Sequence, residues 1–213
     1  MRAKEKLTIP IDRIAEGVEL CLKNSAQFCA DAKMLCKASS CQHAFGLCLY
    51  AIEELGKAEL IKDYSAFLKK RGKTNVVFSK MKAKDFFPLF SPKDLQKLGF
   101  SSKPINPFYD HRCKLFFARR VIGMAMENRL YRSLEGQKFH NLREILDAFD
   151  EKGKDVYELN LKKAGFRETA MYVDYNQKND EWINGTVKIT ATKITELIGD
   201  IEEAIKLMSN ILR

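Results

Sequence analysis

The chain has 213 residues, which is enough for one good hydrophobic core and favours one domain over two. Hydrophobic residues make up 46% of it and charged residues 31%, and this balance excludes wholesale disorder. Its formal net charge of +9, from 37 Lys and Arg against 28 Asp and Glu, favours loose attraction to RNA, DNA, anionic lipid or an acidic protein, unless the excess serves solubility alone.

The sequence carries no recognisable export or membrane segment. Its first ten residues are charged but no apolar core follows them, so we expect no secretory signal. The longest apolar stretch, Ala44–Ile52, is far shorter than the roughly 20 residues of a membrane-spanning helix. Most cysteines have the spacing of a packed helix face and not of a zinc site, so we predict buried, reduced thiols in a cytoplasmic protein without metal or cofactor. The cysteines concerned are Cys21, Cys29, Cys36, Cys41 and Cys48.

Two long helices are predicted in the first third of the chain. Apolar residues recur every three or four positions from about Ile11 to Lys37. A second helix, about Cys41 to Arg71, is apolar on every face over Ala44–Ile52, which is typical of a helix in the middle of a protein. Gly46 and Gly56 lie inside it, where each costs on the order of 1 kcal/mol relative to alanine. Close approach of another helix backbone would offset that cost.

Residues 73–107 are less regular, because four prolines interrupt them. We expect a packed excursion here, with a short helix after Ser91-Pro92. A third long helix follows, from about Tyr109 to Glu135. We expect it to pair antiparallel with the second helix as the spine of a bundle.

The last third of the chain is predicted to add shorter elements and one more long helix. Short helices are expected at about Asn141–Phe149 and Asp155–Lys163, and an extended segment at Arg167–Tyr175. The apolar stripe of a final helix, about Thr190 to Leu212, fits either a core or a dimer seam. The predicted fold is therefore all-α, a helical bundle that fills residues 1–213 as one domain.

The second helix runs from its apolar stretch directly into two carboxylates. Glu53 and Lys57 are an i,i+4 pair in the favourable order, and Glu54 and Lys57 are an i,i+3 pair. Such pairs are common on solvated helix surfaces, where each contributes roughly 0.2–0.5 kcal/mol. On a central helix, however, carboxylates need partners and are candidates for chemistry. Both interpretations stay open.

The third helix opens with a carboxylate, an imidazole and an ammonium group: Asp110, His111 and Lys114. Together at a helix N-terminus these groups form a natural site for an anion or a phosphate. The alternative is a helix cap with an incidental salt bridge between Asp110 and Lys114.

A third cluster, Met171–Tyr175, contains Tyr172 and Asp174 and precedes Trp182, the one tryptophan. Its aromatic residues fit packing with a polar group at one end, which we favour, or a surface on which nucleic-acid bases stack.

These three clusters, in this order, resemble the AbiV-type family of abortive infection proteins. The resemblance rests on Glu53-Glu54-Leu55-Gly56-Lys57, on Asp110-His111 with Lys114, and on Tyr172-Val173-Asp174 with Trp182, and it spans roughly Glu16 to Ala204. It implies an all-α fold related to the HEPN group of helical domains, usually found as dimers. It also implies a role in the shutdown of a phage-infected cell, through interference with translation or RNA.

The sequence departs from this group in one respect. Many HEPN domains are metal-independent ribonucleases that use an arginine followed, after four to six residues, by a histidine. No such spacing occurs in the chain: seven residues separate Arg132 from His140, and His43 and His111 have no arginine at the right distance before them. The resemblance therefore does not carry the usual ribonuclease pair over to this protein.

The leading hypothesis is an abortive-infection effector that acts on RNA or translation. If it cleaves RNA, His111 is the best general acid or base, because imidazole exchanges protons near neutral pH. Lys57 and Lys114 would hold phosphate, and Glu53 or Glu54 would orient the imidazole. The candidate catalytic residues are Glu53, Glu54, Lys57, Asp110, His111 and Lys114, and the candidate binding residues are Arg112, Arg119, Tyr172 and Asp174.

The alternative hypothesis is a non-catalytic binding module, in which the same clusters form a buried salt-bridge network. Its basic surface would engage RNA, the ribosome or a phage protein, and the absence of the arginine–histidine pair favours this interpretation. A helical metal enzyme has less support, because the Glu-x-x-His signature of di-iron bundles is absent. Under either hypothesis we expect a homodimer, a phage protein as trigger and no membrane partner.

Overall fold

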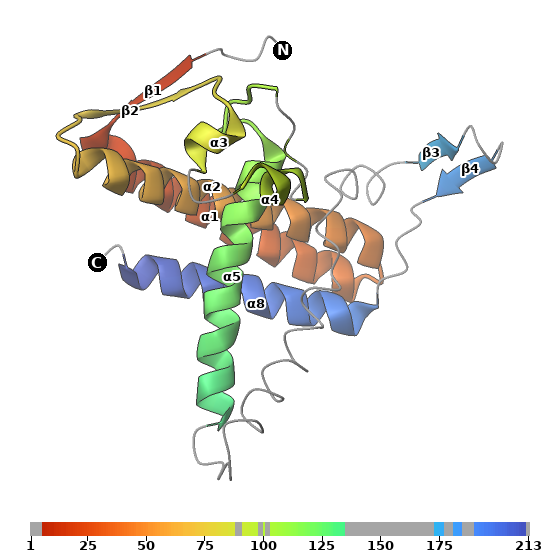
Figure 1. Cartoon of the computed structure of the whole chain (residues 1–213). Helices are drawn as coiled ribbons and strands as arrows, with labels where there is room; N and C mark the ends of the chain where they lie inside the picture. Colours follow the sequence, from red (N-terminus) through yellow and green to blue (C-terminus); the bar gives the residue numbers. More distant parts are fainter. Residues whose placement is uncertain are drawn as a thin grey trace, which may run out of the picture.

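The computed structural model describes residues 6–87, 91–97, 100, 103–134, 173–176, 181–184 and 190–211. Four long helices dominate these residues (Figure 1). They are α1 (Ile14–Lys37), α2 (Cys41–Lys69), α5 (His111–Leu134) and α8 (Ala191–Ile211). A short 3-10 helix, Ile11–Arg13, leads into α1. The all-α fold predicted from the sequence is confirmed, and the long helices begin and end within a few residues of their predicted limits.

Helices α1 and α2 form an antiparallel hairpin. The turn between them is a tight C-cap in which Ser39 adopts φ +61°, and the Ser40 N–H donates to the Leu35 carbonyl at 2.8 Å. The Ser25 hydroxyl of α1 donates to the Ala51 carbonyl of α2 at 2.8 Å. Because so short a turn forces the two helices back along each other, they are the long antiparallel pair on which the bundle is built.

Helix α2 lies at the centre, as its composition predicts. It contacts α1, α5 and α8, and none of its side chains from Ala44 to Tyr64 is exposed. Gly56 has the role expected of it, because a Cβ atom at this position would lie 1.8 Å from the Lys114 carbonyl oxygen of α5. The absence of a side chain therefore lets the α5 backbone rest directly on α2.

The direction of α5 differs from the expected one. Glu53 contacts His111, and farther along both helices Asp63 contacts Arg120, so α2 and α5 run in the same sense where they touch. In Figure 1, α5 crosses the other three long helices and does not lie along α2. The expectation of an antiparallel α2–α5 pair was therefore wrong. The sequence could not set the direction of α5, because the connection before it, residues 70–110, is long enough to allow either direction.

The excursion after α2 contributes one strand to a small sheet that was not predicted from the sequence; the other strand precedes α1. Strand β1 (Lys6–Pro10) pairs antiparallel with β2 (Asn75–Ser79), with Leu7 opposite Phe78. Two short helices follow, α3 (Ala83–Phe86) and α4 (Pro92–Lys97), and α4 is the helix predicted after Ser91-Pro92. Several rings pack the excursion against the bundle: Phe78, Phe86, Phe87, Phe108 and Phe117.

The C-terminal third is described only in part. The short helices predicted at Asn141–Phe149 and Asp155–Lys163 lie outside the described residues. At the end of the predicted extended segment, Val173–Asn176 forms β3, one residue beyond the predicted limit, and it pairs antiparallel with β4 (Glu181–Asn184). The apolar stripe of α8 is buried against α1, α2 and α5, so its role within this chain is core packing. No helix in the described ranges is long and apolar enough to cross a membrane.

All six cysteines are free thiols. Of the five whose spacing predicted burial, Cys21, Cys29 and Cys48 are buried, whereas Cys36 and Cys41 are half-buried. Burial raises the pKa of Cys21 to about 11 and the pKa values of Cys29 and Cys48 to about 12, from an ordinary 9.0. Burial likewise raises the pKa of Cys113. These four thiols are therefore protonated and inert near neutral pH, because the thiolate is the reactive form.

Replacing Gly56 with alanine tests the helix contact. The new methyl group would collide with the α5 backbone, so we expect Gly56→Ala to lower the free energy of unfolding by about 1–3 kcal/mol or more. The matched control is Gly17→Ala in α1, where a Cβ meets nothing within 4 Å and alanine should raise stability by up to about 1 kcal/mol. Urea denaturation measures both values, and equal effects would contradict the close contact.

Thiol reactivity tests the burial of the cysteines. We expect a thiol reagent at neutral pH to modify the half-buried Cys36 and Cys41 first, and the other four only on unfolding. Because these four pKa values are raised in the folded state, their contribution to stability is complete below about pH 9 and declines as pH rises towards 12. Peptide mass spectrometry identifies the modified thiols, and uniform modification of all six in the native protein would show that the core is open.

Candidate functional site

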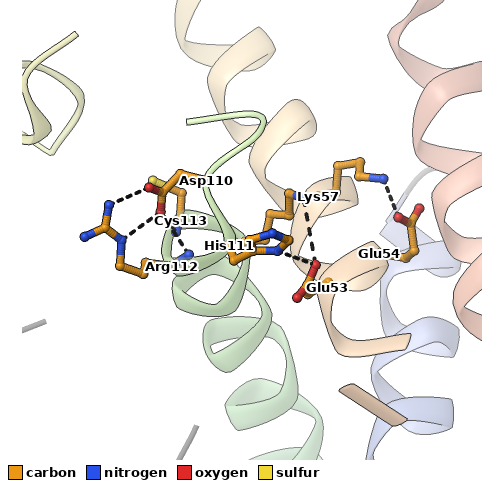
Figure 2. Close-up of polar contacts among 8 residues, drawn as sticks. Glu53, Glu54, Lys57, Asp110, His111, Arg112 and Cys113 are labelled. Carbon is orange, nitrogen blue, oxygen red and sulfur yellow. Dashed lines mark hydrogen bonds and ion pairs between the residues drawn. The ribbon is translucent and has the colours of Figure 1, made fainter. Parts of the chain in front are cut away.

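The N-terminus of α5 is capped by Asp110, the residue that precedes the helix. The Asp110 carboxylate accepts the backbone N–H groups of Arg112 at 2.9 Å and Cys113 at 3.3 Å, which is the N-cap arrangement. Two nitrogens of the Arg112 side chain also donate to Asp110, at 3.1 and 2.6 Å, and the guanidinium lies 5.3 Å from the centre of the Phe100 ring. Asp110 thus caps the helix and pairs with Arg112, on the side away from Glu53 (Figure 2).

The polar centre of the α2–α5 contact is a histidine–carboxylate pair. His111 Nδ1 lies 2.7 Å from Glu53 Oε2 (Figure 2). The Lys114 ammonium lies 3.9 Å from the same oxygen. His111 and Lys114 are three residues apart on one face of α5, and the missing side chain of Gly56 brings that face onto α2. The Glu53 side chain is 12% exposed, whereas that of His111 is 44% exposed. A buried carboxylate is therefore paired with an imidazole that solvent reaches.

This geometry selects the tautomer of a neutral His111. An ionised carboxylate can only accept hydrogen bonds, so Nδ1 must carry the proton that it donates to Glu53. Nε2 then holds the lone pair, and no described residue hydrogen-bonds to it. An imidazole oriented by a carboxylate through one nitrogen, with the other available, can remove a proton from a bound hydroxyl.

Glu54 and Lys57 form a separate pair. The two charged groups make an ion pair, and among the described residues Lys57 has no other ionic partner (Figure 2). Burial contributes most to the raised pKa of the Cys21 thiol of α1, and the negative charge of Glu54 also helps to raise it. The spacing alone did not decide which glutamate pairs with Lys57 and which contacts the histidine. In the structure Lys57 pairs with Glu54, and Glu53 contacts the His111 imidazole.

The remaining predicted site residues are not brought into this centre. Arg119, on α5, is half-buried and makes no hydrogen bond or ion pair with a described residue. Asp174 is in β3, opposite Ile183, and its side chain is not described. Tyr172 lies outside the described residues. Within the described ranges, no three His, Cys, Asp or Glu side chains are arranged to hold a metal ion.

A second buried carboxylate was missed by the sequence analysis. Glu59 of α2 is fully buried, and its carboxylate lies 2.5 Å from the Lys62 ammonium and 3.7 Å from the Arg120 guanidinium of α5. Arg120 pairs with Asp63 as well. The available signal was a lone glutamate between Ala58 and Leu60 on a helix predicted to be central, because such a residue needs a cationic partner.

Comparison with known proteins adds one finding. The family model HEPN_AbiV, described as AbiV, matches residues 13–206, which include Glu53, His111 and Lys114. No curated protein and no solved structure matches the chain.

Removing the second carboxylate tests whether it holds α5 on α2. We expect Glu59→Ala to lower the free energy of unfolding by about 2 kcal/mol or more, because it leaves a cavity and separates Lys62 and Arg120 from their buried partner. The control is Glu16→Ala, which removes an exposed pair with Arg13 and should cost less than about 1 kcal/mol. Equal losses in chemical denaturation would show that the Glu59 pairs contribute nothing beyond a surface pair.

Proposed function

The chain belongs to the AbiV family, which places it in abortive infection, a defence against phage, and on that premise we propose that it is an effector that cleaves RNA and so stops translation in the infected cell. The catalytic group in this proposal is His111, with Glu53 as its positioning residue. Cytoplasmic action, a homodimeric active form and release of activity by a phage protein belong to the same proposal.

One observation carries the proposal: the 2.7 Å contact between His111 Nδ1 and the buried carboxylate of Glu53. The carboxylate holds the ring in one orientation and one tautomer, so that Nε2 points a lone pair at the reacting group. Because the His111 side chain is nearly half exposed while Glu53 is buried, a polymer as large as RNA can reach the imidazole without any rearrangement of the pair.

The chemistry that suits this pair is attack of an RNA 2′-hydroxyl on the adjacent phosphorus. Nε2 of His111 takes the 2′-hydroxyl proton, the 2′-oxygen forms a bond to phosphorus, and the bond from phosphorus to the 5′-oxygen breaks. The 5′-oxygen leaves with a proton from water or from the imidazolium, and the products are a 2′,3′-cyclic phosphate and a 5′-hydroxyl. The step needs no oxidant, reductant or metal ion.

In this proposal Lys114 supplies the positive charge of the site. Its ammonium lies 3.9 Å from the Glu53 carboxylate that orients His111, and its positive charge would stabilise the negative charge that develops on the phosphate oxygens. Lys57 is a weaker candidate for this role than the sequence suggested, because it pairs with Glu54 and not with the carboxylate that orients His111.

The alternative function is a non-catalytic binding module. The observation in its favour is that Glu53 and Lys114 are both largely buried, as in a salt-bridge network that fixes two helices. The protein would then stop translation by binding RNA, the ribosome or a phage protein, and the missing Arg–His spacing of other HEPN domains fits this alternative.

Substitution of the histidine separates the two functions. We expect purified protein incubated with total RNA and tRNA, in the presence of a metal chelator, to produce fragments that end in 2′,3′-cyclic phosphate. His111→Ala should lower the cleavage rate by roughly 10²–10⁴-fold, the usual contribution of a general acid–base group. His43→Ala is the matched control, because His43 is an exposed histidine of α2 whose Nδ1 contacts the Ser40 hydroxyl.

The test of Glu53 must distinguish a role in orienting His111 from a role in stabilising the fold. Glu53→Gln should lower kcat and leave KM nearly unchanged, and Glu53→Asp should recover part of the loss, while circular dichroism shows all variants folded. Intact RNA with the wild-type protein, both alone and in extracts of phage-infected cells, would refute the ribonuclease. Growth arrest by such a protein that survives His111→Ala would establish the binding module.

A further inference from the structure

The positive charge of the protein is concentrated at one end of the molecule. Residues 69–84, from the end of α2 through β2 to α3, contain seven Lys and Arg residues and no Asp or Glu, in a chain whose whole net charge is +9. This segment joins α2 to β2 and α3 at the left and top of Figure 1. We call it the basic end.

The basic end faces solvent. Gly72, with φ +69°, ends α2 and turns the chain, and the lysines on either side of the turn are exposed. Among the described residues, none of the following six side chains makes an ion pair, so their charges are not neutralised within this part of the protein. They are Lys69, Lys70, Arg71, Lys73, Lys82 and Lys84.

Planar groups accompany these charges. The Arg71 guanidinium lies 4.2 Å from the centre of the Phe67 ring, and Phe67 stacks in turn on Tyr64 with ring centres 6.3 Å apart and planes 14° apart. Phe67 is 45% exposed, which makes it one of few large exposed hydrophobic residues among those described. A row of flat groups beside unpaired lysines is the combination that binds single strands, because bases stack on aromatic and guanidinium planes while lysines bind phosphates.

From this arrangement we propose that the basic end is a docking surface for single-stranded RNA, separate from the His111–Glu53 centre. The inference rests on the RNA-directed function proposed above and adds the surface that holds the substrate. An acidic protein is the less suitable partner, because protein interfaces depend on a central cluster of large apolar or aromatic residues. Among the described residues of this end, Phe67 is the one large exposed hydrophobic side chain.

The surface and the catalytic centre lie on the same helix but do not overlap. Lys69 is about 24 Å farther along α2 than Glu53, at the rise of 1.5 Å per residue of an α-helix. A strand held at the basic end can therefore extend towards His111, and substitutions at the basic end leave the contacts of Glu53 and His111 intact. This separation allows binding and cleavage to be tested independently.

The test measures the binding of a fluorescent single-stranded RNA of about 16 nucleotides by anisotropy over a range of salt concentrations. In the triple variant Lys69→Gln, Lys70→Gln, Lys73→Gln we expect binding to weaken roughly tenfold at low salt. We also expect the slope of log affinity against log salt to fall by about 2, because each contact with a single-stranded phosphate contributes about 0.7. Phe67→Leu should weaken single-strand binding roughly fivefold or more and leave duplex binding nearly unchanged.

The matched control removes the same charge elsewhere. Lys23, Lys37 and Lys193 are exposed lysines of α1 and α8, and their triple glutamine variant should bind RNA nearly as the wild type does. Equal losses in the two triple variants would overturn the proposal, because only the total charge would then matter. Competition by polyglutamate as effective as that by unlabelled RNA would also overturn it, in favour of an acidic protein partner.

Failure of the docking surface and failure of the proposed ribonuclease would give different results. A basic-end triple variant that binds RNA as the wild type does would overturn this inference, while cleavage lost in His111→Ala would still support the ribonuclease. Conversely, His111→Ala with normal RNA binding and a wild-type protein without cleavage would refute the ribonuclease and leave the docking surface supported.

Discussion

The contact between Gly56 and the backbone of Lys114 is the constraint on which the rest of the structure depends. Helix α5 could not lie this close to α2 if residue 56 had a side chain, because its Cβ would overlap the Lys114 carbonyl oxygen. The close approach brings the first turn of α5, with His111 and Lys114, onto the part of α2 that carries Glu53. A glycine that is unfavourable in an isolated helix is therefore stabilising here, through the packing that it permits.

Polar pairs on both sides of this contact set the register of the two helices. Glu53 meets His111 on one side of Gly56, and Glu59 meets Arg120 on the other. Apolar packing has little directional preference, so it would allow α5 to slide or rotate on α2, whereas a buried carboxylate is costly in every register that removes its partner. Glu53 consequently has two functions in one contact: it aligns two helices and it orients the imidazole that we propose as the catalytic group.

In our proposals, chemistry and RNA binding are assigned to different parts of α2. Its middle is buried and holds the histidine–carboxylate pair, which suits chemistry that needs a fixed geometry. Its C-terminal end is exposed, basic and flanked by Phe67 and Arg71, which suits a flexible strand of phosphates and bases. A rigid central helix that ends in a charged, exposed turn can thus connect binding to chemistry without a second domain in the described part of the chain.

The sequence by itself determined the long helices, the central position of α2 and the burial of Cys21, Cys29 and Cys48, because periodicity, an apolar stretch such as Ala44–Ile52 and cysteine spacing are local signals. It also identified the two clusters that contain His111 and Glu53. Only the tertiary structure decided that Glu53 rather than Glu54 meets the imidazole, that Lys57 is already neutralised, that β1 and β2 pair, and that α5 crosses α2 in the parallel sense. The physical reason is that Glu53 and Glu54 lie at equally suitable helical spacings from Lys57, while the long connection before α5 leaves its direction to packing at Gly56 and to buried charges that must find partners.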